Sequence, residues 1–424
     1  MDALTINKTD KVILFLILIL VFFLRDIKVL YEPWYIFDLF LLIYIFFQST
    51  KNEAKGSLGH HFWMFISVGL LVVIAFLNIY FYGFGKVFIN NILMIFTPAT
   101  LLLYTSYMSN RYEYDVLFKL GRKILIFLNI YFWINVPIII LQFITGTFMM
   151  GRFLSWGMYA FDHMTGFIGP FGTGILNIFW CALLLGNLFY YLMEKQKVWL
   201  ILFWVQIPTM LILSYFNENK SFIPTVILFL GLFIFYVNFS NKFSFKAVFN
   251  FIIILIIGLF LSLIAYLSSD VIREQVDKLL QLASDFFVNG TPSPENERAY
   301  LNYLAFRYFD AMGLGMGINN LDFNHQTIHK NLGINSLSLI VIQGGVWYYL
   351  SIINIYTVLT VRAVKNIFEK STFLLYFLFY IIYGFISLIT QPFRDHYTMI
   401  MVALLVFFLT IWQKGEELKE LDQN

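Results

Sequence analysis

Residues 62–82 read FWMFISVGLLVVIAFLNIYFY, a run that contains no charged side chain. A helix needs about 20 mostly apolar residues to cross a bilayer, so this stretch predicts a membrane-spanning helix. Runs of the same kind lie on both sides of it, separated by short polar breaks. The sequence predicts twelve spans in all, over residues 11–30, 34–48, 62–82, 87–108, 123–146, 174–193, 197–216, 221–238, 246–268, 333–359, 372–390 and 396–412.

The composition excludes a water-soluble enzyme. Of the 424 residues, 60% are hydrophobic and only 12% are charged, whereas soluble domains are about a quarter charged. The net charge of +3 is too small to indicate nucleic acid, and the single cysteine, Cys181, excludes a disulfide framework and a thiolate metal site. We therefore expect an all-α polytopic membrane protein in one integral membrane domain, residues 1–424. The first run lacks a signal-cleavage pattern and is expected to remain as a span.

The distribution of Lys and Arg predicts the orientation of these spans. With the N-terminus inside, 17 of the 28 Lys and Arg fall on the inner side and 11 on the outer side, five of them in one long loop. Short cytoplasmic loops carry the excess of cations, so both termini are expected in the cytoplasm.

Two outer loops are long, residues 147–173 and 269–332, whereas every inner loop is short. No inner loop is long enough to hold a nucleotide-binding domain. The energy for any bond that this protein forms must therefore arrive stored in its substrate, and the polar residues to consider are those of the outer loops.

The longer loop, 269–332, is predicted to contain two helices. Residues 270–287 have the apolar spacing of an interfacial amphipathic helix, and a second helix is expected from about 294 to 312, ending at Gly313. Arg298 and Arg307 are nine residues apart on the second helix and so lie on opposite faces. Arg307 has Asp310 and Tyr303 at ion-pairing and contact distance along the helix, which favours a surface role. Arg298 is open to either a surface role or a site role.

Two further features of this loop have several interpretations. Gly313–Gly317 lacks the preceding strand and the following Lys-Ser or Lys-Thr of a phosphate-binding loop, so it is interpreted as a flexible break. His325 and His329 are four residues apart and on a helix could hold a metal, with Asp322 as a third ligand. The favoured alternative makes His329 a proton acceptor, because a neutral imidazole beside the membrane accepts a hydroxyl proton near neutral pH.

The corner between the predicted spans 197–216 and 221–238 is polar, with Asn217 and Lys220 in it. It is either a solvated turn or an anion site, where Lys220 supplies a cation and the following helix supplies its N-terminal N–H groups. Arg152, His163 and Arg394 lie in other outer loops and are candidates for the same cavity.

These segments resemble the superfamily of O-antigen and capsular polysaccharide polymerases and O-antigen ligases. The resemblance covers most of the chain, and its most specific part is the order Glu297-Arg298-Ala299-Tyr300, Gly313–Gly317, His329-Lys330-Asn331-Leu332 and Gln343-Gly344-Gly345. Asn217–Ser221 is similar to the family's cationic corner, with Lys220 at the cationic position in place of Arg. His163–Gly174 is similar to its glycine-bearing segment. Lys330 interrupts the family's His-Asn pair.

The resemblance implies a GT-C-like fold and a membrane glycosyltransferase. Such enzymes transfer a sugar chain from undecaprenyl pyrophosphate to an acceptor hydroxyl on the outer face of the bacterial inner membrane, without a nucleotide, metal or other cofactor. A chain-length regulator is a conceivable partner. For an inverting reaction, His329 is the expected base, and Arg298 and Lys220, with Arg152 and Arg394 behind them, would stabilise the negative charge that grows on the leaving pyrophosphate. His325, Asn217 and His163 are expected to support the site.

Three functions follow from these residues. The leading hypothesis is a polymerase that joins lipid-linked repeat units into O-antigen or capsule, and the alternative with the same chemistry is a ligase that transfers finished polymer to lipid A-core. The third is a flippase or ion-coupled transporter of lipid-linked oligosaccharide. Transporters generally carry ionisable residues within their spans, whereas the spans here are almost free of charge, with Asp38 the clear exception.

Overall fold

The structure is a computed structural model. It describes residues 6–23, 31–51, 58–146, 148–149, 164–169, 172–217, 219, 221–239, 266–267, 273–274, 277, 280–281, 284, 297–308, 312–320, 324–325, 330–331, 335–363, 372–389 and 396–423.

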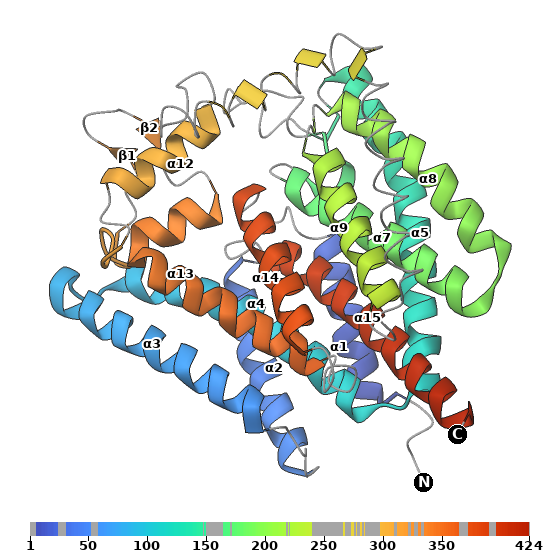
Figure 1. Cartoon of the computed structure of the whole chain (residues 1–424), viewed down its shortest axis with the longest axis horizontal. Helices are drawn as coiled ribbons and strands as arrows, with labels where there is room; N and C mark the ends of the chain where they lie inside the picture. Colours follow the sequence, from blue (N-terminus) through green and yellow to red (C-terminus); the bar gives the residue numbers. More distant parts are fainter. Residues whose placement is uncertain are drawn as a thin grey trace. The chain divides into compact units, whose positions relative to one another are not determined.

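Apart from turns and one short β ladder, the described residues are helical (Figure 1). The first half of the chain contains α1 (Lys8–Phe23), α2 (Tyr31–Lys51), α3 (Leu58–Tyr82), α4 (Lys86–Arg111), α5 (Tyr114–Thr145), the 3₁₀ helix η3 (Gly166–Ile168) and α7 (Thr173–Glu194). The second half contains α8 (Lys197–Phe216), α9 (Phe222–Phe239), α12 (Glu297–Tyr308), β1 (Asn324–His325), β2 (Lys330–Asn331), α13 (Ser336–Ala363), α14 (Thr372–Ile389) and α15 (His396–Gln423).

Among the described residues, six helices are long and apolar enough to cross a membrane, namely α3, α4, α5, α7, α8 and α13. Shorter apolar helical stretches lie in α2, α9, α14 and α15. The surface of α3 is itself apolar, with Phe65 79% exposed and Phe76 68% exposed. Helices of this kind are compatible with a helical membrane protein, because lipid rather than water can cover such side chains.

The chain divides into two compact units, which are described separately. Unit 1 consists of Met1–Gly69, Asn90–Leu230 and Ile352–Asn424, and unit 2 consists of Leu70–Ile89 and Gly231–Ser351. Of the predicted spans, residues 24–30, 246–265, 268, 333–334 and 390 lie outside the described part of the chain.

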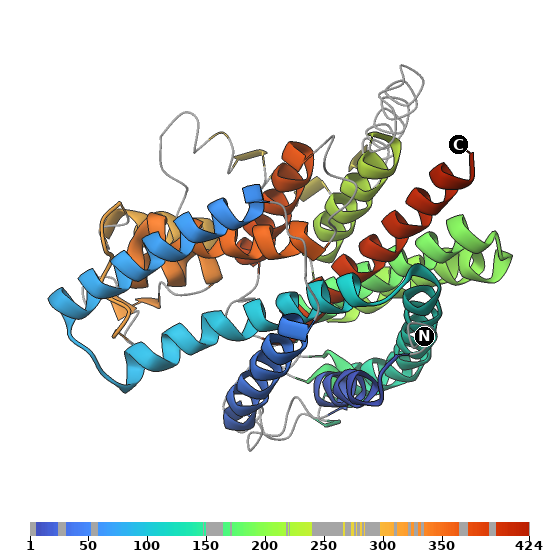
Figure 2. The same ribbon diagram turned by 90° about the horizontal axis from the view of Figure 1, so that it is seen from below.

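Unit 1 is built around α7, which packs against α5, α8 and α15 (Figures 1 and 2). Its Phe179, Trp180 and Tyr190 are at most 1% exposed. Gly186 permits close packing, because a β-carbon there would lie 2.8 Å from Leu125 of α5. Small residues at helix crossings let backbones approach closely, which is how helices pack in membranes.

Three amide side chains connect α5, α7 and α8 near the middle of each helix. Asn187 donates to Asn129 (3.2 Å) and to Gln206 (2.8 Å), and Gln206 donates to Asn129 (2.7 Å). Asn129 donates in turn to Asn187 (2.9 Å) and to the carbonyl of Leu125. The three residues, here called the amide triad, are 0–6% exposed. The triad satisfies buried polar groups without any charge.

Candidate functional site

In unit 2, α12 carries Arg298 in its first turn and packs against the start of α13. The buried contact consists of Leu301, Leu304 and Ala305 from α12 with Leu339 and Ile342 from α13, all at most 6% exposed. Position 298 lies one helical turn before Leu301, on the stripe that also contains Ala305. The packing of α12 therefore fixes the backbone from which Arg298 projects.

A polar contact reinforces this packing at the beginning of α13. The Asn335 side chain accepts a hydrogen bond from the Ser338 N–H (2.9 Å), and the Ser338 hydroxyl accepts one from the Asn335 N–H (3.3 Å). This reciprocal arrangement caps the helix N-terminus. Asn335 also donates to Asn302 of α12 (3.1 Å). The same residue thus caps α13 and ties α12 to it.

Residues 312–320, here called the docked turn, follow α12 and are held at several points in unit 2. The Met316 N–H donates to the Ile342 carbonyl (2.6 Å), and the Tyr82 hydroxyl donates to the Gly315 carbonyl (2.8 Å). The Ile318 N–H donates to the Asn78 side chain (2.8 Å). These bonds come from α13 and from the end of α3, so the turn is fixed to both helices.

The expectation that Gly313–Gly317 is a flexible break is wrong. Gly315 and Gly317 have φ of +64° and +98°, which side chains rarely adopt. A β-carbon on Gly315 would collide with the Ile342 carbonyl, and one on Gly317 would lie 2.5 Å from the Tyr82 ring. The glycines are therefore required for close approach to packed neighbours, and the turn is anchored.

The segment that contains the two histidines forms a β ladder where it is described. Asn324 pairs with Asn331 and His325 with Lys330, antiparallel. His325 therefore lies on a strand and not on the helix that the clamp of His325 and His329 assumed. Lys330, which interrupts the expected His-Asn pair, is the ladder partner of His325. His329 and Asp322 lie outside the described residues.

The Gln343-Gly344-Gly345 segment breaks α13 into two pieces. Gly345 has φ 81° and ψ 176°, which is not helical. A β-carbon on Gly344 would lie 2.5 Å from the Tyr348 ring of the next turn. The sequence placed this segment inside an uninterrupted span, and the break was not foreseen. The kink makes the part of α13 before Gly345 a separate short helix. This first piece of α13 is the one that contacts the docked turn and α12.

In unit 1, two described residues of the polar corner after α8, Asn217 and Asn219, are buried rather than solvated. Asn219, 3% exposed, exchanges hydrogen bonds with Asn177 at the start of α7, and Asn177 also donates to Ser221 (2.9 Å). Asn217, 1% exposed, donates to the Met164 carbonyl (3.3 Å). The amide of Asn217 is thus engaged with backbone, which makes it a positioning residue.

Two side chains of α5 hold the glycine-bearing segment beside this corner by hydrogen bonds. Asn135 accepts from the Phe167 N–H (2.8 Å), and Gln142 accepts from the Gly166 N–H (2.9 Å). Gly166 has φ +67°, and a β-carbon there would collide with Asn135. We call Asn135, Gln142, Thr165, Asn177, Asn217 and Asn219 the corner cluster; all six are at most 3% exposed. It joins two segments of the resemblance, Asn217–Ser221 and His163–Gly174.

The predicted cations fall largely beyond what the structure describes. Lys220, Arg152, Arg394 and His163 lie outside the described residues, as does the side chain of Arg298. Arg307 is exposed and donates to the Tyr303 hydroxyl (2.9 Å), stacking on its ring at 5.9 Å. Its predicted partner Asp310 is also outside. The surface role predicted for Arg307 agrees with its contact to Tyr303.

One buried acidic residue in unit 1 was not predicted. Asp10, 0% exposed, accepts hydrogen bonds from the hydroxyls of Tyr44 (2.9 Å), Tyr104 (3.2 Å) and Tyr112 (2.5 Å). Burial, followed by the hydrogen bond to Asp10, raises the pKa of the Tyr112 phenol above its usual range. No local pattern signals this cluster, because Tyr44 is 34 residues from Asp10 and Tyr104 and Tyr112 are about a hundred residues from it.

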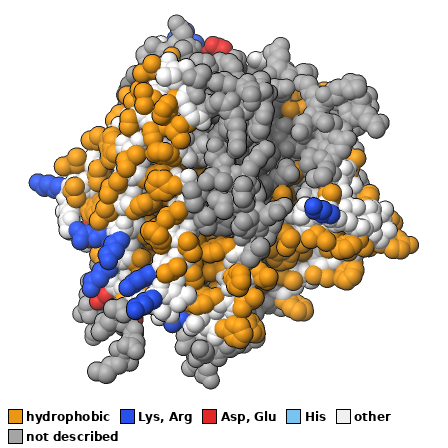
Figure 3. All heavy atoms as spheres, turned by 180° about the vertical axis from the view of Figure 1, so that it is seen from behind, with side chains coloured by type: hydrophobic (Ala, Val, Ile, Leu, Met, Phe, Trp, Pro, Cys, Tyr) orange, Lys and Arg blue, Asp and Glu red, His pale blue; other side chains and the backbone are white. Residues whose placement is uncertain are grey.

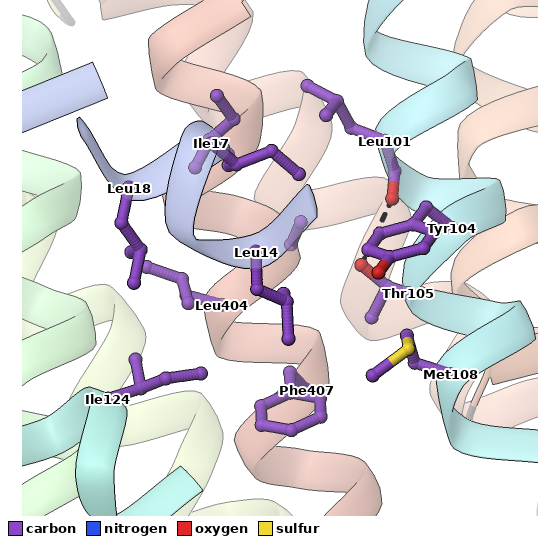
Figure 4. Close-up of a pocket in the computed structure, with 12 residues that line it drawn as sticks. Leu14, Ile17, Leu18, Leu101, Tyr104, Thr105, Met108, Ile124, Leu404 and Phe407 are labelled. Carbon is purple, nitrogen blue, oxygen red and sulfur yellow. Dashed lines mark hydrogen bonds between the residues drawn. The ribbon is translucent and has the colours of Figure 1, made fainter. Parts of the chain in front are cut away.

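An apolar cavity of about 60 Å³ lies next to Tyr104, between α1, α4, α5 and α15 (Figure 4). Figure 4 shows Leu14, Leu404 and Phe407 turned toward it, and the Thr105 hydroxyl is bonded to the Leu101 carbonyl. A cavity this small and this apolar is a packing defect of the helix bundle and not a sugar site.

Neither a protein-family model nor a curated protein matches this chain. Its activity must therefore be inferred from its own residues.

Proposed function

We propose that this chain is a membrane glycosyltransferase that polymerises polyprenyl-pyrophosphate-linked oligosaccharide repeat units into O-antigen or capsule. The proposal includes twelve spans, both termini in the cytoplasm, a GT-C-like fold and a site on the outer face of the bacterial inner membrane. The location in a membrane is supported by a set of long apolar helices, which are compatible with a membrane protein.

One observation carries the proposal. The four segments in the resemblance's most specific order all belong to unit 2, and two of them are tied directly to the first piece of α13. The helix that bears Arg298 packs on Ile342, the docked turn bonds the Ile342 carbonyl, and the Gln343-Gly344-Gly345 break follows at once. Three of the four motifs are thereby collected around a few residues of α13, as the parts of one site would be.

The proposed chemistry uses the residues in separate roles. The acceptor hydroxyl oxygen attacks the anomeric carbon, the bond from that carbon to the pyrophosphate oxygen breaks with its electron pair, and the hydroxyl proton passes to the His329 imidazole. Arg298 binds the pyrophosphate as its negative charge grows, aided by Lys220, Arg152 and Arg394. Attack opposite the leaving group inverts the anomeric centre. His325, Asn217 and His163 would support this arrangement, and a chain-length regulator is a proposed partner.

The test uses two arginines of the same helix. In cells that lack the gene, Arg298→Ala and His329→Ala should each lower polymer formation by about a hundredfold or more at normal protein level. Arg307→Ala is the matched control, because Arg307 is exposed and contacts Tyr303, and it should retain polymer. The readout is the length distribution of surface polysaccharide on a gel. Wild-type polymer from both Arg298→Ala and His329→Ala would contradict the mechanism.

Two experiments, deletion of the gene and an assay of the purified protein, distinguish the polymerase from a ligase and from a transporter. A single-repeat product in the deletion strain supports a polymerase, whereas full-length polymer retained on the carrier would indicate a ligase. Purified protein with lipid-linked repeat units should lengthen chains without an energy source. No growth under these conditions would favour a flippase or transporter.

A further inference from the structure

A groove of about 530 Å³ runs along unit 1 between α5 and α8. Its rim consists of exposed apolar side chains such as Ile126 (43%), Ile134 (49%) and Val198 (51%). Its floor is formed by Trp199 and Asn129, which are 4% and 6% exposed. The volume falls within the range of about 300–1,000 Å³ in which proteins hold small ligands.

The groove lining has almost no hydrogen-bonding group that a bound molecule could use. Asn129 is engaged in the amide triad, which uses its carbonyl oxygen and its N–H groups. The Trp199 indole N–H donates to Glu194 (2.9 Å), beyond the end of the groove. Polar ligands such as sugars lose hydrogen bonds in such a place, so the fitting occupant is hydrocarbon.

The length of the groove matches one leaflet of a bilayer. From Ile126 to Ile134 it follows α5 for about 12 Å, at 1.5 Å per helical residue. Half of a hydrocarbon core of about 30 Å is about 15 Å. An acyl chain that enters at one end therefore fits within a single leaflet.

Cations gather at the end of the groove where both helices begin. Residues 119–123 and 194–197 contain five cations, Lys119, Arg122, Lys123, Lys195 and Lys197, against one acid, Glu194. The two segments touch, because Arg122 pairs with Glu194 at 3.3 Å. On the face drawn in Figure 3, Lys and Arg side chains gather at the lower left, directly below an apolar surface.

Two of these cations lie closest along the chain to the groove lining. Lys123 precedes Ile126 by three residues and Ile130 by seven, so it stands on the same face of α5 as the lining. Lys197 directly precedes Val198 at the start of α8. Both side chains are exposed, and Arg122 is partly occupied by Glu194. Lys123 and Lys197 are therefore the cations best placed for a headgroup above the chain.

We propose that this groove and its basic end form a binding site for an anionic phospholipid, with one acyl chain in the groove and the phosphate at Lys123 and Lys197. The charge of the basic end complements a phosphate, and the uncharged groove complements a fatty chain. By the predicted orientation the site faces the cytoplasmic leaflet. The site is independent of the glycosyltransferase proposal and requires only that these helices lie in a membrane.

The experiment uses full-length protein in vesicles of phosphatidylcholine with a fixed fraction of brominated lipid, which quenches nearby tryptophan. Brominated phosphatidylglycerol is compared with brominated phosphatidylcholine. Trp133 and Trp199 line the groove, so the groove signal is the quenching that a Trp133→Phe/Trp199→Phe variant lacks. We expect stronger groove quenching by phosphatidylglycerol. Equal quenching by the two lipids would overturn the proposal.

Charge variants locate the headgroup. Lys123→Gln/Lys197→Gln should reduce the preference for phosphatidylglycerol by about fivefold per cation. Lys8→Gln/Lys11→Gln removes two exposed cations from α1 instead and should keep the preference. A preference that survives Lys123→Gln/Lys197→Gln, or that falls equally in both double variants, would overturn the proposal. All four lysines are exposed, so loss of folding is not expected to confuse the result.

Discussion

The corner cluster of unit 1 and the docked turn of unit 2 both fix motif segments, but by different means. The corner cluster uses buried amides that grip backbone groups, as Asn135 and Gln142 grip the segment at Gly166. The docked turn uses glycines that bring backbone against backbone at Ile342. An amide can follow a small shift of its partner, whereas touching backbones cannot move apart without losing contact. The docked turn should therefore tolerate substitution less well.

The strongest test of this difference is Gly315→Ala. The new β-carbon would meet the Ile342 carbonyl group and lie 2.8 Å from the Val341 carbonyl oxygen, at φ +64°. We expect a loss of about 2–5 kcal/mol in the free energy of unfolding, from backbone strain and overpacking. The measurement is the midpoint of thermal unfolding in detergent.

Gly146→Ala is the matched control. Gly146 has nearly the same backbone angle, φ +65°, but a β-carbon there would meet nothing within 4 Å. It should lose only the strain of a left-handed residue, about 1–2 kcal/mol. If Gly315→Ala and Gly146→Ala unfold at the same temperature, the close approach at Gly315 contributes nothing to the loss of stability.

A smaller effect is expected from Asn177→Leu in the corner cluster. Leucine keeps the approximate volume but removes the hydrogen bonds to Asn219 and Ser221, so the buried Asn219 amide loses its acceptor. An unsatisfied buried amide costs about 1–3 kcal/mol, which again lowers the unfolding midpoint. Thr209→Val, which alters a hydroxyl bonded within its own helix, should leave the midpoint nearly unchanged. Equal unfolding midpoints for Asn177→Leu and Thr209→Val would show that the buried amide hydrogen bonds do not stabilise the corner cluster.

The smallest effect is expected from Tyr82→Phe. The change removes one hydrogen bond to the Gly315 carbonyl and leaves the ring that packs against Gly317. The expected loss is about 0.5–1.5 kcal/mol. Hydrogen exchange of peptides covering 312–320 should become faster. Tyr80→Phe, on an 81% exposed side chain, is the control and should leave exchange unaltered; acceleration by it too would refute a specific role for Tyr82.

The helices were predictable because hydrophobic length is a local signal. The run 62–82 ends with α3, and residues 197–216 coincide with α8. A helix was also expected around Arg298, where α12 lies within the predicted 294–312. Each of these predictions needs only the composition and spacing of neighbouring residues.

The geometry of the motif segments was not predictable in the same way. The Gly-x-Gly pattern is the same in a loose turn and in an anchored one. Tyr82, which bonds the docked turn, is 233 residues from Gly315 in the sequence. The corner around Asn217 is as polar as a solvated turn, yet Asn217 and Asn219 are buried and bonded to Met164 and to Asn177 of α7. His325 adopts a strand because Lys330 pairs with it, which spacing along the chain does not reveal. These outcomes depend on long-range contacts.

The amide triad also bears on how the chain is assembled. Its members lie on α5, α7 and α8, which are made in that order. Until α8 has been made, Asn129 and Asn187 have each other but lack Gln206 as a third partner. Each such bond contributes only about 0.6 kcal/mol in a membrane, so the incomplete pair should open readily. Gln206 adds two further hydrogen bonds, so we expect this helix group to reach its final arrangement only after α8 has been made.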